Sequence, residues 1–450
     1  MASDTAAPAE GGGLAYRLLR YAIDVRQAEV AALGWSWLYV FSILSAYYVL
    51  RPLRDAAGVE GGVNNLPWLF TATLLAMLAV NPAFAALVKR FSRQRFISLS
   101  YRFFMLNLVL FAFLLAMPPG EGRIWVDRAF FVWISVFNLF VVSVFWAFIV
   151  DVFDSEQGKR LFGFLAAGAT LGAILGSSLT SGVIERVQPF WLLLASIIML
   201  EVAVFAVRRL SRLSEAFRRL PGQGGGEAPI GGGVLAGLTH ALRSPYLLNV
   251  ALFILLYSVT STFLYFQQAE IASTAFADRA SRTAFFANID LLVNVLTLVV
   301  QVFLTSRILG ALGVGLTLAA LPLCSLLGFG VLAVAPSIAA VVAVQVARRV
   351  SNFALARPTR ELLFTVLPRE DKYKAKSFID TVVYRAGDQV GSWSYALLGA
   401  VGLGLSGVAW VAVPLSAVWL VGALWLGRRQ EERARLPRPE AVPLAVAGSP

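Results

Sequence analysis

The sequence predicts an all-α membrane protein with twelve transmembrane helices arranged as two six-helix halves. Of its 450 residues, 58% are hydrophobic and only 14% are charged, and the mean hydropathy is +0.73. A soluble core cannot bury that much apolar surface, so we expect the apolar segments to face lipid. A bilayer-spanning helix needs about 20 apolar residues, and about twelve blocks of that length lie between charged, Pro or Gly breaks.

Basic residues are concentrated in alternate loops. The net charge is +12, from 38 Lys and Arg against 26 Asp and Glu. Basic clusters precede the first apolar block and follow every second one, at 17–26, 89–95, 159–160, 208–219, 372–376 and 428–435. This is the positive-inside pattern, with both termini in the cytoplasm. It explains the charge without a nucleic-acid partner and makes the lipid bilayer the expected surroundings.

The first half is expected at 30–207, after a cytoplasmic tail at 1–29. The first 13 residues are rich in Ala, Pro and Gly and lack the basic start and apolar core of a cleaved signal. The predicted helices lie near 30–50, 66–88, 96–117, 129–153, 161–183 and 190–207.

A basic and Gly-rich segment at 208–246 follows, with the sequence PGQGGGEAPIGGG inside it. This composition is typical of a flexible linker, here cytoplasmic. The second half is expected at 247–427, with helices near 247–268, 283–305, 314–334, 338–367, 377–403 and 408–426. The remaining residues, 428–450, form a charged and Pro-rich cytoplasmic tail.

The two halves resemble each other in sequence. A shift of 215 positions places four residues of the first half on similar residues of the second: Glu156 on Asp371, Lys159 on Lys374, Gly172 on Gly387 and Gly176 on Gly391. Two parallel six-helix halves joined by a cytoplasmic linker are the plan of the major facilitator superfamily. Carriers of this plan hold substrate near the midplane between the halves.

The stretch AYYVLRPLRDAAG ends the first apolar block with Arg51, Arg54 and Asp55. A spacing of three puts both arginines on one side of a helix. A cation at the edge of an apolar span is costly unless it faces partners or water, so we interpret the pair as the wall of an anion-binding cavity. The alternative is that both side chains extend to the lipid headgroups.

Polar residues also recur along three predicted helices in the second half. One face of 283–305 carries Asp290, Asn294, Thr297 and Gln301. The helix at 338–367 carries Gln345, Arg348, Arg349 and Asn352, and 377–403 carries Asp380, Tyr384 and Asp388 at steps of four, with Arg385 beside them. A charge at the bilayer centre costs about 2.5 to 3.5 kcal/mol, so these groups should face a watery cavity. The alternative is that they pair with one another and fix helix packing.

We therefore predict a substrate-binding site made of Arg51, Arg54, Asp290, Asn294, Arg348, Arg349, Tyr384, Arg385 and Asp388. Arginine outnumbers acid within the spans, which favours a small anionic substrate, because guanidinium groups match phosphate and carboxylate oxygens.

The turns DSEQGKR and REDKYKAK mix acids and bases on the cytoplasmic side of corresponding helices. Pairs across the halves would close the inner mouth when the cavity opens outward; the predicted cytoplasmic gate is Glu156, Lys159, Asp371 and Lys374. Solvated loop charges that only set topology are the alternative.

Motifs for other chemistry are missing from the sequence. It has no GxxxxGK[ST] phosphate loop, and the single Cys324 and single His240 cannot build a Cys/His metal site. Gly168, Gly172 and Gly176 recur every fourth residue, which is typical of close helix packing. We expect no enzyme activity, no cofactor and no metal.

Three segments carry a resemblance to a known family. YYVLRPLRD, EQGKRLFGFLAAGATLGAILG and ARPTRELLFTVLPREDKYKAKSFIDTVV together resemble the ATP/ADP translocases of plastids and intracellular bacteria. The last segment is the most specific, with Thr359, Arg360, Glu361, Lys374, Lys376 and Asp380 in step with the family pattern. The resemblance implies exchange of ATP for ADP without hydrolysis, by a monomer in a bacterial inner membrane.

The resemblance places Arg54 on a functional lysine of that family and Arg51 on its neighbouring arginine. Acids expected in the fourth and seventh helices are missing, and Asp388 stands where a lysine is expected. The charge reversal at Asp388 weakens the match to nucleotide recognition, and what the resemblance implies is a nucleotide or a related phosphorylated anion as substrate. The alternatives are a proton-coupled carrier of another organic anion, with Asp290 or Asp388 as the proton-carrying group, and a non-transporting membrane scaffold whose charges are all paired.

Overall fold

A computed structural model describes residues 24–90, 93–153, 155–218, 244–367, 375–376 and 378–435. The regular structure of these residues is entirely helical. Eleven of their helices are long and apolar enough to cross a membrane. The predicted all-α membrane fold is therefore confirmed.

The helices of the first half match the predicted apolar blocks in order and extend beyond most of them. They are preceded or joined by the short 3-10 turns η1 (Gln27–Glu29) and η2 (Val63–Asn65). The helices are α2 (Val30–Glu60), α3 (Leu66–Arg90), α4 (Arg93–Leu114), α5 (Glu121–Val152), α6 (Ser155–Val183) and α7 (Pro189–Arg218).

In the second half, two predicted spans contain π-helical segments. The helices are α9 (Pro245–Ala275), α10 (Arg279–Phe303), α11 (Thr305–Val334), α12 (Ile338–Val350), η3 (Ser351–Ala356), α13 (Arg357–Leu363), η4 (Ile379–Val383), α15 (Tyr384–Ala400) and α16 (Leu405–Arg435). The π-helices η3 and η4 interrupt the tenth and eleventh spans. Such bulges occur frequently at functional sites.

The first helix differs from its prediction in length. The apolar block ends at Leu50, but α2 continues to Glu60 with Pro52 inside it. Arg51 and Arg54 therefore lie within the helix and not at its end. Hydropathy could not predict this continuation, because the charged residues end the apolar block without ending the helix.

The described residues form two compact units. The first unit draws on Met1–Ala228, Leu264–Leu298 and Ser337–Val342, and the second on Pro229–Phe263, Val299–Pro336 and Ala343–Pro450. These units group parts of α9, α10 and α12 with the first half of the chain. The boundaries at 30–207, 208–246 and 247–427 stay a prediction, and residues 219–243 of the linker lie outside the described residues.

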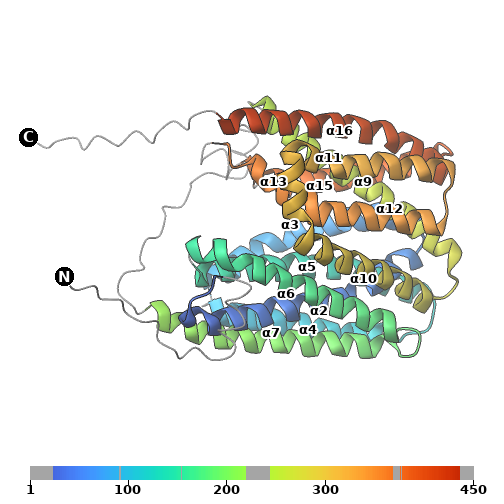
Figure 1. Ribbon diagram of the computed structural model, residues 1–450. Coiled ribbons are helices and arrows are strands. Elements are labelled where there is room, and N and C mark those ends of the chain that lie inside the picture. The colour runs from blue at the N-terminus through green and yellow to red at the C-terminus, as the bar shows by residue number, and fades with distance from the viewer. Residues whose placement is uncertain are drawn as a thin grey trace, which may run out of the picture. The chain divides into compact units, whose positions relative to one another are not determined.

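In the first unit, α2 packs along α5, α6 and α7, and Figure 1 shows α2 running beside α6 and α7. Glycines permit the close approach of α6. A Cβ at Gly172 would meet the carbonyl of Phe41, and one at Gly176 would meet the carbonyl of Ser45. The predicted packing role of these glycines is confirmed.

The second unit repeats this contact between α15 and α9. A Cβ at Gly387 would come within 2.6 Å of Ser258 Cβ, and one at Gly391 within 2.9 Å of Thr262 Cβ. In both units, then, the paired glycines lie against the long helix that opens the corresponding half. The sequence repeat at an offset of 215 positions thus corresponds to a repeated packing contact.

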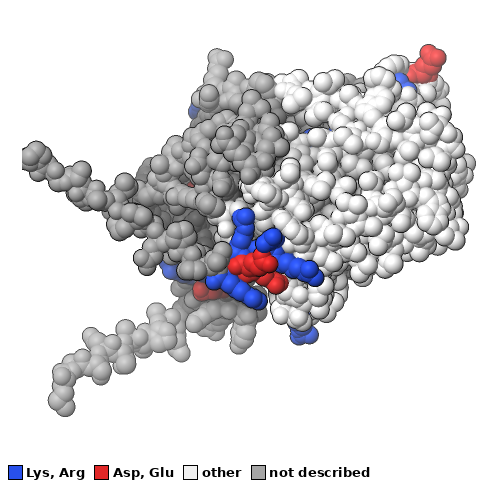
Figure 2. Space-filling model, turned by 90° about the horizontal axis from the view of Figure 1, so that it is seen from above, with Lys and Arg blue, Asp and Glu red and all other residues white. Residues whose placement is uncertain are grey.

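The surface over α16 suits a bilayer. Figure 2 shows a face that is mostly free of charged side chains, with Lys, Arg, Asp and Glu gathered at the C-terminal turns of α16. Along α16, Trp410 and Val421 are 58% and 68% exposed. Uncharged helix surface of this kind faces the lipid tails, whereas the charged end lies at the membrane boundary.

Candidate functional site

The first cluster of candidate residues lies on α2. Their spacing of three and four brings Arg51, Arg54 and Asp55 onto neighbouring positions of one face. The Asp55 side chain is 5% exposed, and its Oδ1 accepts a hydrogen bond from Arg54 Nε at 3.0 Å. Arg51 Nε lies 3.9 Å from Asp55 Oδ2. One buried carboxylate therefore faces two guanidinium groups.

Two other helices of the first unit complete this cluster. Asp290 of α10 places Oδ1 3.1 Å from Arg51 Nη1. The hydroxyl of Tyr265, on α9, lies 3.1 Å from Asp55 Oδ1 and donates to it. Two cations and two anions thus give a cluster without net charge.

Each of the two guanidinium groups also lies over an aromatic ring. Arg51 lies over the ring of Tyr48 at 5.6 Å, and Arg54 over the ring of Phe131 at 5.1 Å. The arginine side chains keep 19% and 15% of their surface exposed. Their charged ends contact acids and rings of the unit, which does not agree with extension to lipid headgroups.

Asn294 and Thr297 follow Asp290 along the predicted polar face of α10. The three residues are only 2% to 6% exposed. Asn294 Nδ2 and Thr297 Oγ1 have no hydrogen-bond partner among the described residues. Buried polar atoms are normally satisfied, so these two are available to water or a bound solute. Gln301, further along the face, is exposed and donates to the carbonyl of Phe353.

In the second unit, Arg348 of α12 is buried at 2% exposure. Four of its N–H groups donate hydrogen bonds: Nε to Ser325 Oγ at 2.9 Å, Nη1 to Ser261 Oγ at 2.8 Å, and Nη2 to Thr260 Oγ1 at 2.7 Å and to the Tyr257 carbonyl at 3.1 Å. The guanidinium also lies over the rings of Tyr257 and Trp419 at 5.4 and 5.9 Å. These four hydrogen bonds therefore fix the orientation of the Arg348 guanidinium group.

All these partners of Arg348 are neutral. Among the described residues, no carboxylate lies within ion-pair distance of its guanidinium. Hydroxyl and carbonyl oxygens satisfy its hydrogen bonds but leave its positive charge uncompensated. A buried charge without a counter-ion is costly, so its retention marks a candidate anion site.

Tyr384, Arg385 and Asp388 form a third group, on α15. Arg385 Nη1 lies 3.2 Å from Asp388 Oδ2, and the guanidinium lies 5.7 Å from the Tyr384 ring. Ser258 of α9 donates to both Asp388 and the Tyr384 carbonyl. The Tyr384 and Tyr257 rings are 6.1 Å apart, so this group borders the surroundings of Arg348.

Arg349 does not join Arg348. Consecutive helical residues point about 100° apart, and the Arg349 guanidinium lies 6.0 Å from the ring of Phe353. Asn352 in η3 takes the side of Arg348 instead, where its Nδ2 donates to the Tyr257 hydroxyl at 3.0 Å. Of the predicted arginines in the second unit, Arg348 is the most enclosed.

The predicted gate stays a prediction. Asp371 and Lys374 lie outside the described residues, and so do the side chains of Glu156 and Lys159 at the start of α6. Neighbouring residues of each unit do form ion pairs: Arg160 with Glu29 at 2.9 Å, Arg360 with Asp380 at 3.3 Å, and Lys376 with Glu361.

Sequence reasoning missed the hydroxyl partners of Arg348. Thr260 and Ser261 belong to a run of hydroxyl residues, SVTST, within the apolar part of α9. That run was a usable signal, because hydroxyls inside a span commonly bond across helices.

It also missed a buried acid at the start of α5. Asp127 is fully buried, 2.7 Å from Arg279 Nη1 and 3.3 Å from Arg123 Nε.

Comparisons with known proteins agree with this architecture. No protein-family model matches the chain. Two solved structures cover 92% of it with a TM-score of 0.53 each: a bacterial homolog of the human lysosomal transporter Spinster, in an inward-facing and unoccupied conformation, at 12% identity, and the nucleoside transporter NupG at 11% identity. The matched regions include 99% of the Spinster homolog chain and 100% of the NupG chain. The chain has a major facilitator-like fold.

The chain is also similar in sequence to part of a curated protein. Over 221 residues, 43% of this chain, it is 26% identical to ADP,ATP carrier protein 2 of Chlamydia pneumoniae. The match spans 41% of that relative's length. This weak similarity covers less than half of either chain and does not show membership of the ATP/ADP translocase family; the solved structures show the fold.

Proposed function

We propose that this protein is a membrane transporter that exchanges nucleotides, ATP for ADP, or carries a related phosphorylated anion by alternating access. The major facilitator-like fold and the local similarity to an ADP,ATP carrier support a transporter. The resemblance of its charged segments to nucleotide exchange carriers supports the substrate class. The proposal includes a monomer in a bacterial inner membrane with both termini in the cytoplasm.

The observation that carries the proposal is the surroundings of Arg348. Its guanidinium is buried, oriented by four hydrogen bonds to neutral groups, and has no carboxylate partner among the described residues. A fixed positive charge of this kind attracts an anion without first having to break an ion pair. A scaffold would gain nothing from such a charge, which argues against the non-transporting alternative.

Arg51 and Arg54 have a complementary role in the proposal. In the structure, Asp290 pairs with Arg51 and Asp55 pairs with Arg54. A phosphate that binds these guanidinium groups would take over part of those contacts, and the acids would turn to the rest of the solute. Neutral pairing in the empty state lowers the cost of keeping two cations within a span.

A proton-coupled anion carrier is the second candidate, because Asp290 and Asp388 each pair with an arginine. An anion that displaced either carboxylate from its arginine would favour protonation of that carboxylate. Anion binding and proton binding would then be linked.

Uptake into liposomes reconstituted with the full chain tests the proposal. Vesicles are loaded with ADP, with phosphate, or with no solute, and uptake of labelled ATP is measured with and without a pH gradient. Competition by other nucleotides, inorganic phosphate and carboxylates defines the substrate class.

Uptake that requires internal ADP, and that nucleotides compete for best, is the expected result. Uptake that needs a pH gradient but no internal ADP would favour the proton-coupled carrier. Equal uptake by protein-containing and empty vesicles for every anion in the panel would contradict transport.

A further inference from the structure

An apolar groove lies on the first unit between α3, α4 and α5. Both α3 and α4 pack on α5 through aromatic rings, with Phe70 and Phe131 6.3 Å apart and Phe104 and Phe137 5.1 Å apart. The space left between α3 and α4 has a volume of about 1240 Å³. Its wall contains Trp68, Leu99 and Phe103, which are 54% to 63% exposed. Because these helices are candidate membrane spans, the groove opens toward lipid.

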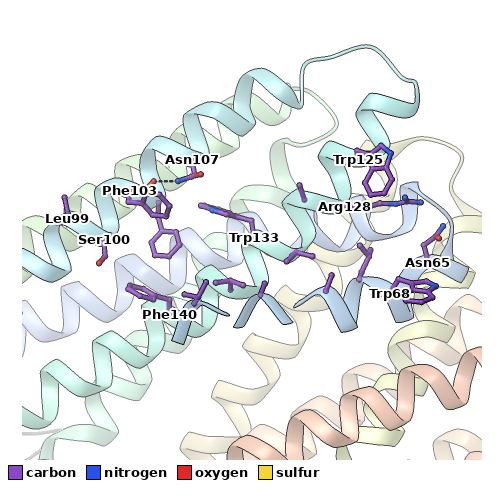
Figure 3. A pocket seen from close by; sticks show the side chains of 18 of the residues that line it. Asn65, Trp68, Leu99, Ser100, Phe103, Asn107, Trp125, Arg128, Trp133 and Phe140 are labelled. Carbon is purple, nitrogen blue, oxygen red and sulfur yellow. Dashed lines mark hydrogen bonds between the residues drawn. The ribbon is translucent and has the colours of Figure 1, made fainter. Parts of the chain in front are cut away.

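Two amide side chains that line the groove donate to nearby backbone carbonyls. Asn107 Nδ2 donates to the carbonyl of Phe103 at 2.8 Å, as Figure 3 shows. Asn65 donates in the same way to the Gly61 carbonyl. The body of the groove therefore fits an apolar occupant.

One end of the groove differs from the rest. Figure 3 shows Arg128 there, together with Trp125, Trp68 and Asn65, whereas Leu99, Ser100 and Phe140 line the opposite end. The Arg128 guanidinium lies 4.7 Å from the Trp125 ring. Asn65 belongs to the turn between α2 and α3, so this end is level with the helix ends. Tryptophans and arginines at that depth are typical of the membrane interface.

Arg128 has no acidic partner within ion-pair distance among the described residues, and its Nε is buried without a hydrogen-bond partner. Nearby acids are already paired. Asp127 lies between Arg123 and Arg279, and Glu60 pairs with Arg282 at 2.6 Å. Arg128 thus presents an uncompensated positive charge at the mouth of the groove.

We propose that this groove binds one acyl chain of an anionic phospholipid, whose phosphate group contacts Arg128. From Trp125 to Phe140, α5 rises about 22 Å, which exceeds the roughly 15 Å depth of one leaflet of the hydrocarbon core. A chain that enters beside Arg128 is therefore accommodated along its full length. This inference is independent of the solute that the protein transports.

Native mass spectrometry of the purified full chain tests the proposal. The probes are phosphatidylglycerol and phosphatidylcholine with identical acyl chains. The wild type should bind the first phosphatidylglycerol about fivefold more tightly than phosphatidylcholine, the effect of one basic side chain on an anionic lipid. Arg128→Gln should remove this preference, and Arg128→Lys should keep most of it.

The matched control for charge is Arg209→Gln on α7. Arg209 also lies over an aromatic ring, that of Phe205, at 5.1 Å, and it is more exposed than Arg128, but it does not line the groove. This substitution should leave the preference of the first bound lipid unchanged. An unchanged preference in Arg128→Gln, or an equal loss in Arg209→Gln, would overturn the assignment of the headgroup to Arg128.

A second pair of variants tests the groove itself. Ala129 lines it and Ala79, on α3, is exposed outside it. Ala129→Trp fills space in the groove and should weaken binding of both lipids, whereas Ala79→Trp should not. Unchanged lipid affinity in Ala129→Trp would overturn the proposal. A dimeric wild type together with a monomeric Ala129→Trp that still bound lipid would also overturn the proposal. In that case a second copy of the chain, and not a lipid, would cover the groove.

Discussion

Arg51 on α2 and Asp290 on α10 form an ion pair, with 3.1 Å between Nη1 and Oδ1. Both side chains are largely buried, at 19% and 3% exposure. The pair joins the helix that opens the chain to one that follows the linker in sequence. Coupling between these residues is therefore a test of how the first unit is assembled.

A double-mutant cycle measures this coupling. Arg51→Gln and Asp290→Asn should each lower the free energy of unfolding in detergent, because each removes one charge of a largely buried ion pair. The double variant should be more stable than the sum of the single effects by about 1 to 3 kcal/mol. Additive effects would show that the two charges do not interact in the folded protein.

Removing the charge of Asp127 should strongly destabilise the protein. Asp127→Asn leaves Arg123 and Arg279 facing each other without the carboxylate, at an expected cost of about 3 to 5 kcal/mol in the free energy of unfolding. The control is Glu432→Gln, whose pair with Arg429 at 2.8 Å is exposed and contributes at most about 1 kcal/mol. Thermal unfolding that separates the two variants by less than a few degrees would contradict a structural role for Asp127.

Alanine in place of a glycine of α6 should destabilise the protein only where α6 contacts α2. Gly172→Ala puts a Cβ against the Phe41 carbonyl, and such overpacking costs about 1 to 3 kcal/mol. Gly182→Ala, on the same helix but with nothing within 4 Å of its Cβ, should be neutral or slightly stabilising. Equal midpoints of thermal unfolding for the two variants would disprove the close approach of α2 and α6.

The same comparison applies to the second unit. Gly387→Ala on α15 meets Ser258 of α9, whereas Gly399→Ala meets nothing within 4 Å. If the repeated contact is real, the pair Gly387 and Gly399 should reproduce the difference between Gly172 and Gly182. A neutral Gly387→Ala would limit the packing contact to the first unit.

The positions of the spans could be predicted from the sequence, because apolar blocks of bilayer length have few other solutions. The end of α2 could not, because hydropathy falls at Arg51 although helical structure continues to Glu60. The repeat offset of 215 positions correctly matched Gly172 with Gly387, since small residues at a helix contact leave a regular pattern.

The candidate site was only partly predictable. Helical spacing placed Asp290 and Asn294 on one face, where both are buried. Spacing could not show which side chain each arginine meets, because those partners come from other helices. Arg348 was therefore predicted as one of several arginines, whereas its contacts with Ser261 and Ser325 distinguish it from Arg349.

The central claim is that the uncompensated charge of Arg348 binds the transported anion. The direct measurement is uptake of labelled ATP into ADP-loaded vesicles by Arg348→Gln, compared with wild type and with Arg209→Gln. Loss of a charge-assisted contact worth about 1.5 to 3 kcal/mol predicts uptake at least tenfold below wild type at subsaturating ATP. Arg209→Gln should transport like the wild type. Wild-type uptake by correctly folded Arg348→Gln would contradict the account.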